Sequence, residues 1–296
     1  MTATVLDSAE RLKDILDRLV AKSEADYYNP YQLFQWPDTL PQEQYWMSPE
    51  LMSVHGTEVG AELTEEQLHK LSKWESVNFY SLNVHGIREL ITEVIARIHT
   101  KEFKLTSEYF HHIIGEENEH MWFFARFCNQ YGGKIYPDLT FKFDQASTDG
   151  PAAHFLVFAR LLLFEEIVDF FNKRMGEDER LDPTIRKVNA IHHQDESRHV
   201  AFGRQIVSLL WKDLAAKSDE SELEAVRAYL KAYLRRSLES LVNPAAFRDA
   251  GIPEPYKARN RVLADPAHAD LDRAILKRSV KFLVAEGILL TESIDA

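Results

Sequence analysis

The sequence predicts an all-α protein whose core is an antiparallel four-helix bundle. Between about residues 63 and 212, apolar residues recur every three to four positions in four consecutive segments. The chain of 296 residues contains only 11 glycines and 11 prolines, which is few for an all-β protein. Short connections join the four segments, and helices joined in this way usually pack antiparallel.

The first two helices have recognisable ends. The first is expected over residues 63–99, where Thr64 and Gln67 have the spacing of a capping box. The second begins at Ser107 and ends at the pair Gly132-Gly133, because glycine readily adopts the left-handed conformation that closes a helix.

The third and fourth helices follow a loop at 137–151 that is rich in Asp, Pro and Gly. The third, over residues 151–174, is apolar nearly all round, which indicates a helix buried among others. Asp182 is the expected N-cap of the fourth helix, and Pro183 is its first residue.

We expect one domain with an added segment at each end of the bundle. Residues 1–62 form an N-terminal arm, which is irregular over 26–60 because Tyr, Pro and Trp are frequent there. Residues 63–212 form the four-helix core, and residues 213–296 form a C-terminal extension of further helices.

Composition excludes several classes of function. The formal net charge of −12 argues against a nucleic-acid or anionic-membrane partner, since either needs a basic surface. Cys128 is the only cysteine, so the chain has no internal disulfide and no cysteine-based zinc or iron–sulfur site. The most apolar run, 155–171, is too short and too charged to span a bilayer. We therefore expect a cytoplasmic protein.

The stretch HHQDESRH, at 192–199 on the fourth helix, predicts a metal site. Each residue of an α-helix advances about 100°, so His192, Glu196 and His199 fall within roughly 60° of one another. Such a stripe of His, Glu and His either faces solvent or holds a metal ion.

A matching pair on the second helix favours the metal. Glu117 and His120 have the same spacing as Glu196 and His199. Two Glu-x-x-His pairs on two helices, with one Glu on each of two others, form the ligand set of di-iron carboxylate bundles. The two carboxylates bridge the ions and offset their charge, and each ion takes an imidazole.

The third helix offers Glu165 and Glu166 in the apolar context RLLLFEEIVDFF. A carboxylate buried there without a partner would cost several kcal/mol, and a metal ion would remove that cost. We choose Glu165 as the ligand and keep Glu166 as the alternative.

On the first helix we choose Glu89. In an antiparallel pair, ligands at equal height lie equally far from the turn, which we place near residues 102–103. Glu93 and His85 remain alternatives, whereas Glu75 lies too far along the helix.

Two further acids are expected to support the ligands. Metal-bound imidazoles usually donate their free N–H to a carboxylate. Asp195 is the expected partner of His120 across the bundle, and Glu116 that of His199.

The order Glu, Glu-x-x-His, Glu, His-x-x-x-Glu-x-x-His resembles the p-aminobenzoate N-oxygenase (AurF-like) di-iron oxygenases of the ferritin-like superfamily. His192 supplies the additional histidine that marks this family. The resemblance covers about residues 70–210 and implies a ferritin-like bundle. It also implies that two iron ions are bound by Glu89, Glu117, His120, Glu165, His192, Glu196 and His199. Of these ligands, Glu117, Glu196 and His192 are expected to take part in catalysis.

The resemblance further implies that the reduced irons react with O₂ to give a diferric–peroxo species, which N-oxygenates a small-molecule amine. One alternative function is a C–H hydroxylase or desaturase with the same ligands. The non-catalytic alternative is an iron-storage protein of ferritin type. No glycine-rich nucleotide motif is present, so electrons are expected from a separate reductase. Assembly as a homodimer is compatible with the sequence.

Overall fold

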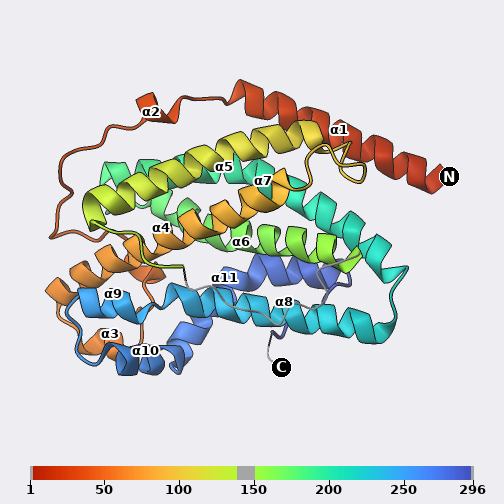
Figure 1. Cartoon of the computed structure of the whole chain (residues 1–296). Helices are drawn as coiled ribbons and strands as arrows, with labels where there is room; N and C mark the ends of the chain where they lie inside the picture. The colour runs from red at the N-terminus through yellow and green to blue at the C-terminus, as the bar shows by residue number, and fades with distance from the viewer. Residues whose placement is uncertain (1–2, 139–150, 295–296) are drawn as a thin grey trace.

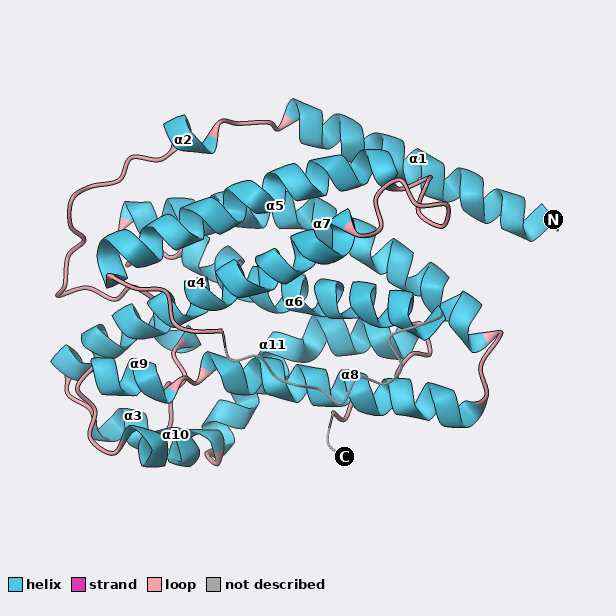
Figure 2. Ribbon diagram, viewed as in Figure 1, coloured by secondary structure: helices cyan, strands magenta, loops and turns pink. Residues whose placement is uncertain are grey.

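A computed structural model describes residues 3–138 and 151–294. Within these ranges every regular element is helical and none is a strand, as Figures 1 and 2 show. The prediction of an all-α fold is confirmed. The four core helices are α4 (Glu65–Ile95), α5 (Ser107–Phe127), α6 (Pro151–Glu177) and α7 (Pro183–Ala215). The loop expected at 137–151 falls largely outside the described residues.

The predicted helix ends are present in the structure. Thr64 and Gln67 form a capping box at the start of α4, and the Asp182 side chain accepts a hydrogen bond from the backbone N–H of Thr184 at the start of α7. α5 continues into a π-helical turn, Cys128–Gly132, and Gly133 closes it with a φ of 68°. These local signals set the helix boundaries because each satisfies backbone groups that the helix itself leaves unpaired.

The core helices pack in two antiparallel pairs, α4 with α5 and α6 with α7. Gly86 brings α4 close to α6, since a Cβ at this position would lie 2.4 Å from the Phe164 ring. Gly203 has the same effect between α7 and α6, where a Cβ would meet Leu162 at 3.0 Å. The close approach places the inward side chains of all four helices within reach of one another.

The N-terminal arm begins with a long helix. Helix α1 (Ala3–Ala25) lies along α5 and α7 (Figure 1). The segment expected to be irregular contains only short helices, α2 (Pro30–Leu33), η1 (Pro49–Leu51) and α3 (Glu58–Glu62). The arm therefore covers the two helices that carry the Glu-x-x-His pairs.

The C-terminal extension consists of α8 (Glu220–Leu241), α9 (Pro244–Asp249), α10 (Pro255–Leu263) and α11 (Pro266–Ala285). Helices α8, α9 and α11 pack on α4 or α6, on the opposite side of the bundle from α1, and α10 packs on α9, α11 and α3 (Figure 1). None of the helices in the described ranges combines the length and apolarity needed to cross a bilayer.

Candidate metal centre

Acidic and imidazole side chains from α5, α6 and α7 meet in the middle of the bundle. Four of them can place one ligand atom each within 4.8 Å of one another, and two more, His192 and Glu165, adjoin these four. At most 5% of the surface of any of the six is exposed. The six residues, called the donor cluster below, are Glu117, His120, Glu165, His192, Glu196 and His199.

Glu117 and Glu196 lie at the centre of the donor cluster. Nδ1 of His120 is 3.4 Å from Glu117 and 3.5 Å from Glu196. Nδ1 of His199 is 2.7 Å from Glu117 and 3.5 Å from Glu196. Each of the two carboxylates therefore contacts both imidazoles, which is the arrangement that carboxylates bridging two metal ions require.

His192 extends the donor cluster on the side of His120. Its Nε2 lies 3.1 Å from Glu196, and the rings of His192 and His120 are 4.4 Å apart. The amide of Asn172 lies 2.5 Å from the other ring nitrogen of His192, so Nε2 is the nitrogen that faces the cluster. This geometry turns the third histidine inward rather than to solvent.

The structure distinguishes Glu165 from Glu166. Glu165 is buried beside Glu196, and burial together with the charge of Glu196 raises its pKa well above the usual range. Glu166 instead pairs with Arg204 at 2.6 Å and accepts a hydrogen bond from the hydroxyl of Ser279 at 2.5 Å. Only Glu165 belongs to the donor cluster.

Both expected supporting acids contact their histidines. Nε2 of His120 lies 3.1 Å from Asp195, and Nε2 of His199 lies 2.7 Å from Glu116. A neutral imidazole that donates Nε2–H to a carboxylate keeps its lone pair on Nδ1, and in both residues Nδ1 faces the donor cluster.

Arg198 holds the two supporting acids in place. Its guanidinium contacts Asp195 at 2.7 Å and Glu116 at 2.8 Å, and it also reaches Asp26 at the end of α1 at 3.1 Å. The side chain is only 5% exposed, so these charge-assisted contacts are shielded from solvent. α1 is thereby tied to the groups that orient both imidazoles.

The charges in the donor cluster shift the pKa values of its members in opposite directions. Burial disfavours the charged form of His120, but Glu117 and Asp195 outweigh it and raise the pKa to about 10. Burial lowers the pKa of His192 to about 4, so this ring is neutral at pH 7. For Glu117 the neighbouring imidazoles outweigh burial and lower the pKa.

The donor cluster fits a metal ion better than it fits a set of internal hydrogen bonds. All six residues have buried side-chain atoms that lack a hydrogen-bond partner outside the donor cluster, within the described part of the chain, among them both carboxylate oxygens of Glu117, Glu165 and Glu196. Buried polar atoms without partners are costly, and a metal ion would satisfy them together. Imidazole and carboxylate are donors that iron accepts.

Comparison with known proteins agrees with this chemistry. A family profile described as p-aminobenzoate N-oxygenase AurF matches residues 9–287. The chain belongs to the AurF family. The match extends across α1 and most of the C-terminal extension, beyond the four helices that carry the motif.

A solved oxidase structure has a fold similar to that of this AurF-family protein. An R2-like ligand-binding oxidase, a point mutant with an aerobically reconstituted Mn/Fe cofactor, shares 14% identity over 94% of both chains with a TM-score of 0.53. Another mutant of that oxidase, reconstituted anaerobically with Mn/Fe, shares 16% identity over 87% of this chain and 92% of its own, with a TM-score of 0.47. No curated protein sequence matches the chain.

Family membership assigns the chain to the non-haem di-iron oxidoreductases. It is therefore an enzyme of the oxygenase class with a metal centre, not an iron-storage protein. The donor cluster is the one group of metal-binding geometry found among residues 3–138 and 151–294.

One expected member of this AurF-type site lies elsewhere. Glu89 is 55% exposed and pairs with Arg160 at 3.0 Å. Its neighbours Ile87 and Leu90 are buried, and Glu89 is rotated by about 200° and 100° from them around α4. The direction of its side chain therefore keeps Glu89 out of the donor cluster. The alternatives also lie apart, with Glu93 paired to Arg97 and His85 bonded to the carbonyl of Tyr136.

Sequence reasoning missed several residues that contact the donor cluster or its supporting acids. Asn172 contacts His192, and Tyr28 of the N-terminal arm donates a hydrogen bond to Asp195. No spacing rule connects these positions to the motif, because Tyr28 lies 167 residues from its partner. Arg198 had a local signal, since it lies three residues after Asp195 and would share its helix face.

Proposed function

We propose that this protein acts in the cytoplasm as an O₂-dependent oxygenase that uses two iron ions to N-oxygenate the amine of a small molecule. The observation that carries the proposal is the donor cluster, whose buried carboxylate and imidazole atoms lack other partners. Family membership supports the reaction class. When bound, the two ions would supply the electrons that reduce O₂.

In this proposal the donor cluster would hold its two ions at two positions, which we assign from the contacts within the cluster. Glu117 and Glu196 would bridge, because each contacts both His120 and His199. His120 and His192 would complete the first position, since their rings adjoin. His199 and Glu165 would complete the second, since both line one small cavity.

That small cavity is too small for an organic substrate. Its volume is about 30 Å³, close to the share of one water molecule in the liquid, and its other walls are apolar, including Leu90, Ile113 and Phe202. In this proposal it would hold a small molecule such as O₂ beside the second position.

A larger cleft of about 370 Å³ is our candidate for substrate binding. It lies between α4, α6 and α8, and Asn83, Gly86, Phe164 and Tyr233 are among its lining residues. Its volume suits a small molecule, and α6, which carries Glu165, forms one wall. The C-terminal extension would contribute to the substrate site through α8.

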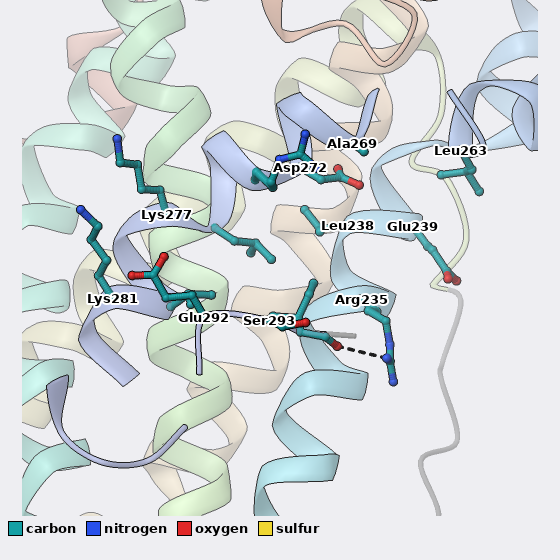
Figure 3. Close-up of a pocket in the computed structure, with 14 residues that line it drawn as sticks. Arg235, Leu238, Glu239, Leu263, Ala269, Asp272, Lys277, Lys281, Glu292 and Ser293 are labelled. Atoms are coloured by element: carbon teal, nitrogen blue, oxygen red, sulfur yellow. Dashed lines mark hydrogen bonds between the residues drawn. The ribbon is translucent and has the colours of Figure 1, made fainter. Parts of the chain in front are cut away.

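The largest cleft, of about 680 Å³, is less suited to this role. It is lined by α8, α10, α11 and residues 292–294, and no member of the donor cluster reaches it. Figure 3 shows its charged rim, with Lys277 and Lys281 on α11 and Arg235 bonded to the backbone carbonyl of Ile294.

Electrons would come from a separate reductase. The chain has no nucleotide-binding glycine motif, so the sequence marks no site for a nicotinamide or flavin electron donor. A reductase that docks on this protein is therefore part of the proposal.

The first test is metal content. Iron-loaded protein should retain about two ions per chain, and Glu117→Ala or Glu196→Ala should remove most of the metal while circular dichroism stays helical. Glu89→Ala is the matched control, because this Glu lies outside the donor cluster. Equal metal content in all three variants would reject the site.

The second test is the reaction. Chemically reduced protein is mixed with O₂ and one of two analogues of a single scaffold, with or without a primary amine. We expect a single turnover to yield an N-oxygenated product from the amine only, detected by mass spectrometry with ¹⁸O₂. Oxygen found at carbon would reject N-oxygenation and favour a C–H hydroxylase.

A further inference from the structure

Helix α4 brings no carboxylate to the donor cluster, although the other three core helices do. Glu75 is buried but accepts hydrogen bonds from the backbone and hydroxyl of Ser53. Glu89 and Glu93 are engaged with arginines outside the cluster. Bundles of this kind generally place a donor from each of four helices at the metals. Either a different residue of α4 therefore fills this ligand position, or no residue of α4 does.

Contacts between the helices show which residue of α4 lies at the right height. Tyr80 accepts a hydrogen bond of 2.7 Å from Asn189 on α7, and its ring stacks on Phe124 of α5 at 5.1 Å. α4 and α7 run parallel because each is antiparallel to α5. The Glu117–His199 and Phe124–His192 contacts show this for α7, and α4 and α5 form one of the antiparallel pairs of the bundle.

Asn83 is consequently level with His192. It lies three residues after Tyr80, as His192 does after Asn189, which is about 4.5 Å further along both helices. On antiparallel α5 the same step leads from Phe124 toward His120. Asn83 therefore lies at the height of the two histidines of the first metal position.

The hydrogen bonds of Asn83 leave its amide oxygen free. Asn83 is fully buried, and its Nδ2 donates to the carbonyl of Phe79 at 2.8 Å. Its Oδ1 has no hydrogen-bond partner among the described residues. A buried acceptor left unpaired costs about 1–3 kcal/mol, so this oxygen is expected to have a partner that binds there.

We propose that Oδ1 of Asn83 is the α4 ligand of the metal ion held by His120 and His192. This inference rests on the proposed function and specifies one of its two metal positions. A neutral amide oxygen would take the place of a carboxylate, so three carboxylates would face two divalent ions. The first position would bind its ion more weakly than the second, because Glu165 belongs to the second and no unshared carboxylate belongs to the first.

Manganese titration tests the proposal without measuring activity. Free Mn²⁺ is followed by electron paramagnetic resonance as it is added to metal-free protein, and the wild type should bind two ions with unequal affinities. Asn83→Asp keeps the shape and adds a carboxylate, so it should tighten the weaker site by roughly tenfold or more. Asn83→Leu removes the donor and should weaken the same site by a similar factor.

Asn78→Leu is the matched control on α4. Asn78 is also buried, but it donates to the carbonyls of Ser240 and Leu241 and accepts from Asn243. This variant should lose stability without altering the ratio of the two Mn²⁺ affinities. An equal change in that ratio in Asn78→Leu would overturn the proposal, because it would reflect general damage to α4.

The remaining outcomes separate this inference from the proposed function. A wild type that binds no Mn²⁺ would reject the metal centre, and the inference with it. Two bound ions whose affinities are unchanged in Asn83→Asp would overturn the inference alone, even if Asn83→Leu does not fold. The inference would also fail if Asn83→Leu kept both affinities and only raised the KM for an amine, since Asn83 would then bind substrate instead of metal.

Discussion

The hydroxyl of Tyr28 donates a hydrogen bond of 2.9 Å to Oδ2 of Asp195, the same oxygen that lies 3.1 Å from Nε2 of His120. A residue of the N-terminal arm thus contacts the acid that orients a histidine of the donor cluster. Asp195 also pairs with Arg198, so its carboxylate is held from three directions. The arm is part of the support of the metal centre as well as a cover for the bundle.

Tyr28→Phe should lower the free energy of unfolding by about 1 kcal/mol, the usual contribution of one hydrogen bond. The ring stays in place, and only the donor to Asp195 is lost. Urea denaturation of the metal-free protein measures the change. Tyr27→Phe is the control, because this side chain is 74% exposed. Equal effects of the two substitutions would show that the Tyr28 hydroxyl does not stabilise the fold.

Glu165→Gln and Glu166→Gln should have opposite consequences although the residues are adjacent. Loss of the Glu165 carboxylate removes a donor and should lower metal content, measured by elemental analysis, with little loss of stability in the metal-free protein. Loss of the Glu166 carboxylate breaks the ion pair with Arg204 and should lower stability while metal content is kept. Metal loss in Glu166→Gln alone would reverse our choice between the two.

Glu75→Gln should change how stability depends on pH. Burial raises the pKa of Glu75 to about 7, so between about pH 4.5 and 7 the folded state binds a proton that the unfolded state has lost. Wild-type stability therefore falls as pH rises through this range, by on the order of 3 kcal/mol in full. Glutamine can still accept from Ser53 and does not ionise, so the variant should gain stability relative to wild type from pH 5 to pH 8.

Urea denaturation at several pH values checks this result. Glu66→Gln, at an exposed position of the same helix, is the control and should keep the fall in stability above pH 4.5, because the Lys70 ion pair lowers the pKa of Glu66 instead of raising it. A stability difference between Glu75→Gln and wild type that does not vary with pH would contradict the assignment of this titration to Glu75.

Removal of metal should lower the melting temperature. An ion that binds only the folded state adds about 2.7 kcal/mol when its free concentration is a hundred times its Kd. Scanning calorimetry with and without a chelator measures the shift, and Glu196→Ala should melt at the same temperature in both conditions. A wild type that is insensitive to the chelator and carries no metal would contradict the proposed centre.

The all-α fold and the ends of the core helices could be predicted from sequence because their signals are local. The capping box at Thr64 and the N-cap at Asp182 satisfy backbone groups within three residues of themselves. The pairs Glu117–His120 and Glu196–His199 share a face through helical geometry alone. The partnership of Asp195 and Glu116 with the two histidines was predicted on another ground, because metal-bound imidazoles usually donate their free N–H to a carboxylate.

Tertiary structure decided what depends on the rotation of one helix against another. The sequence predicts Glu89 as the ligand from α4, yet the helix turns Ile87 and Leu90 inward and Glu89 toward Arg160. Apolar burial sets that rotation, because turning Glu89 inward would expose apolar side chains to water. The same rotation buries Asn83, which no metal-ligand pattern singles out. The contact of Tyr28 with Asp195 likewise exists only once the chain between them has folded.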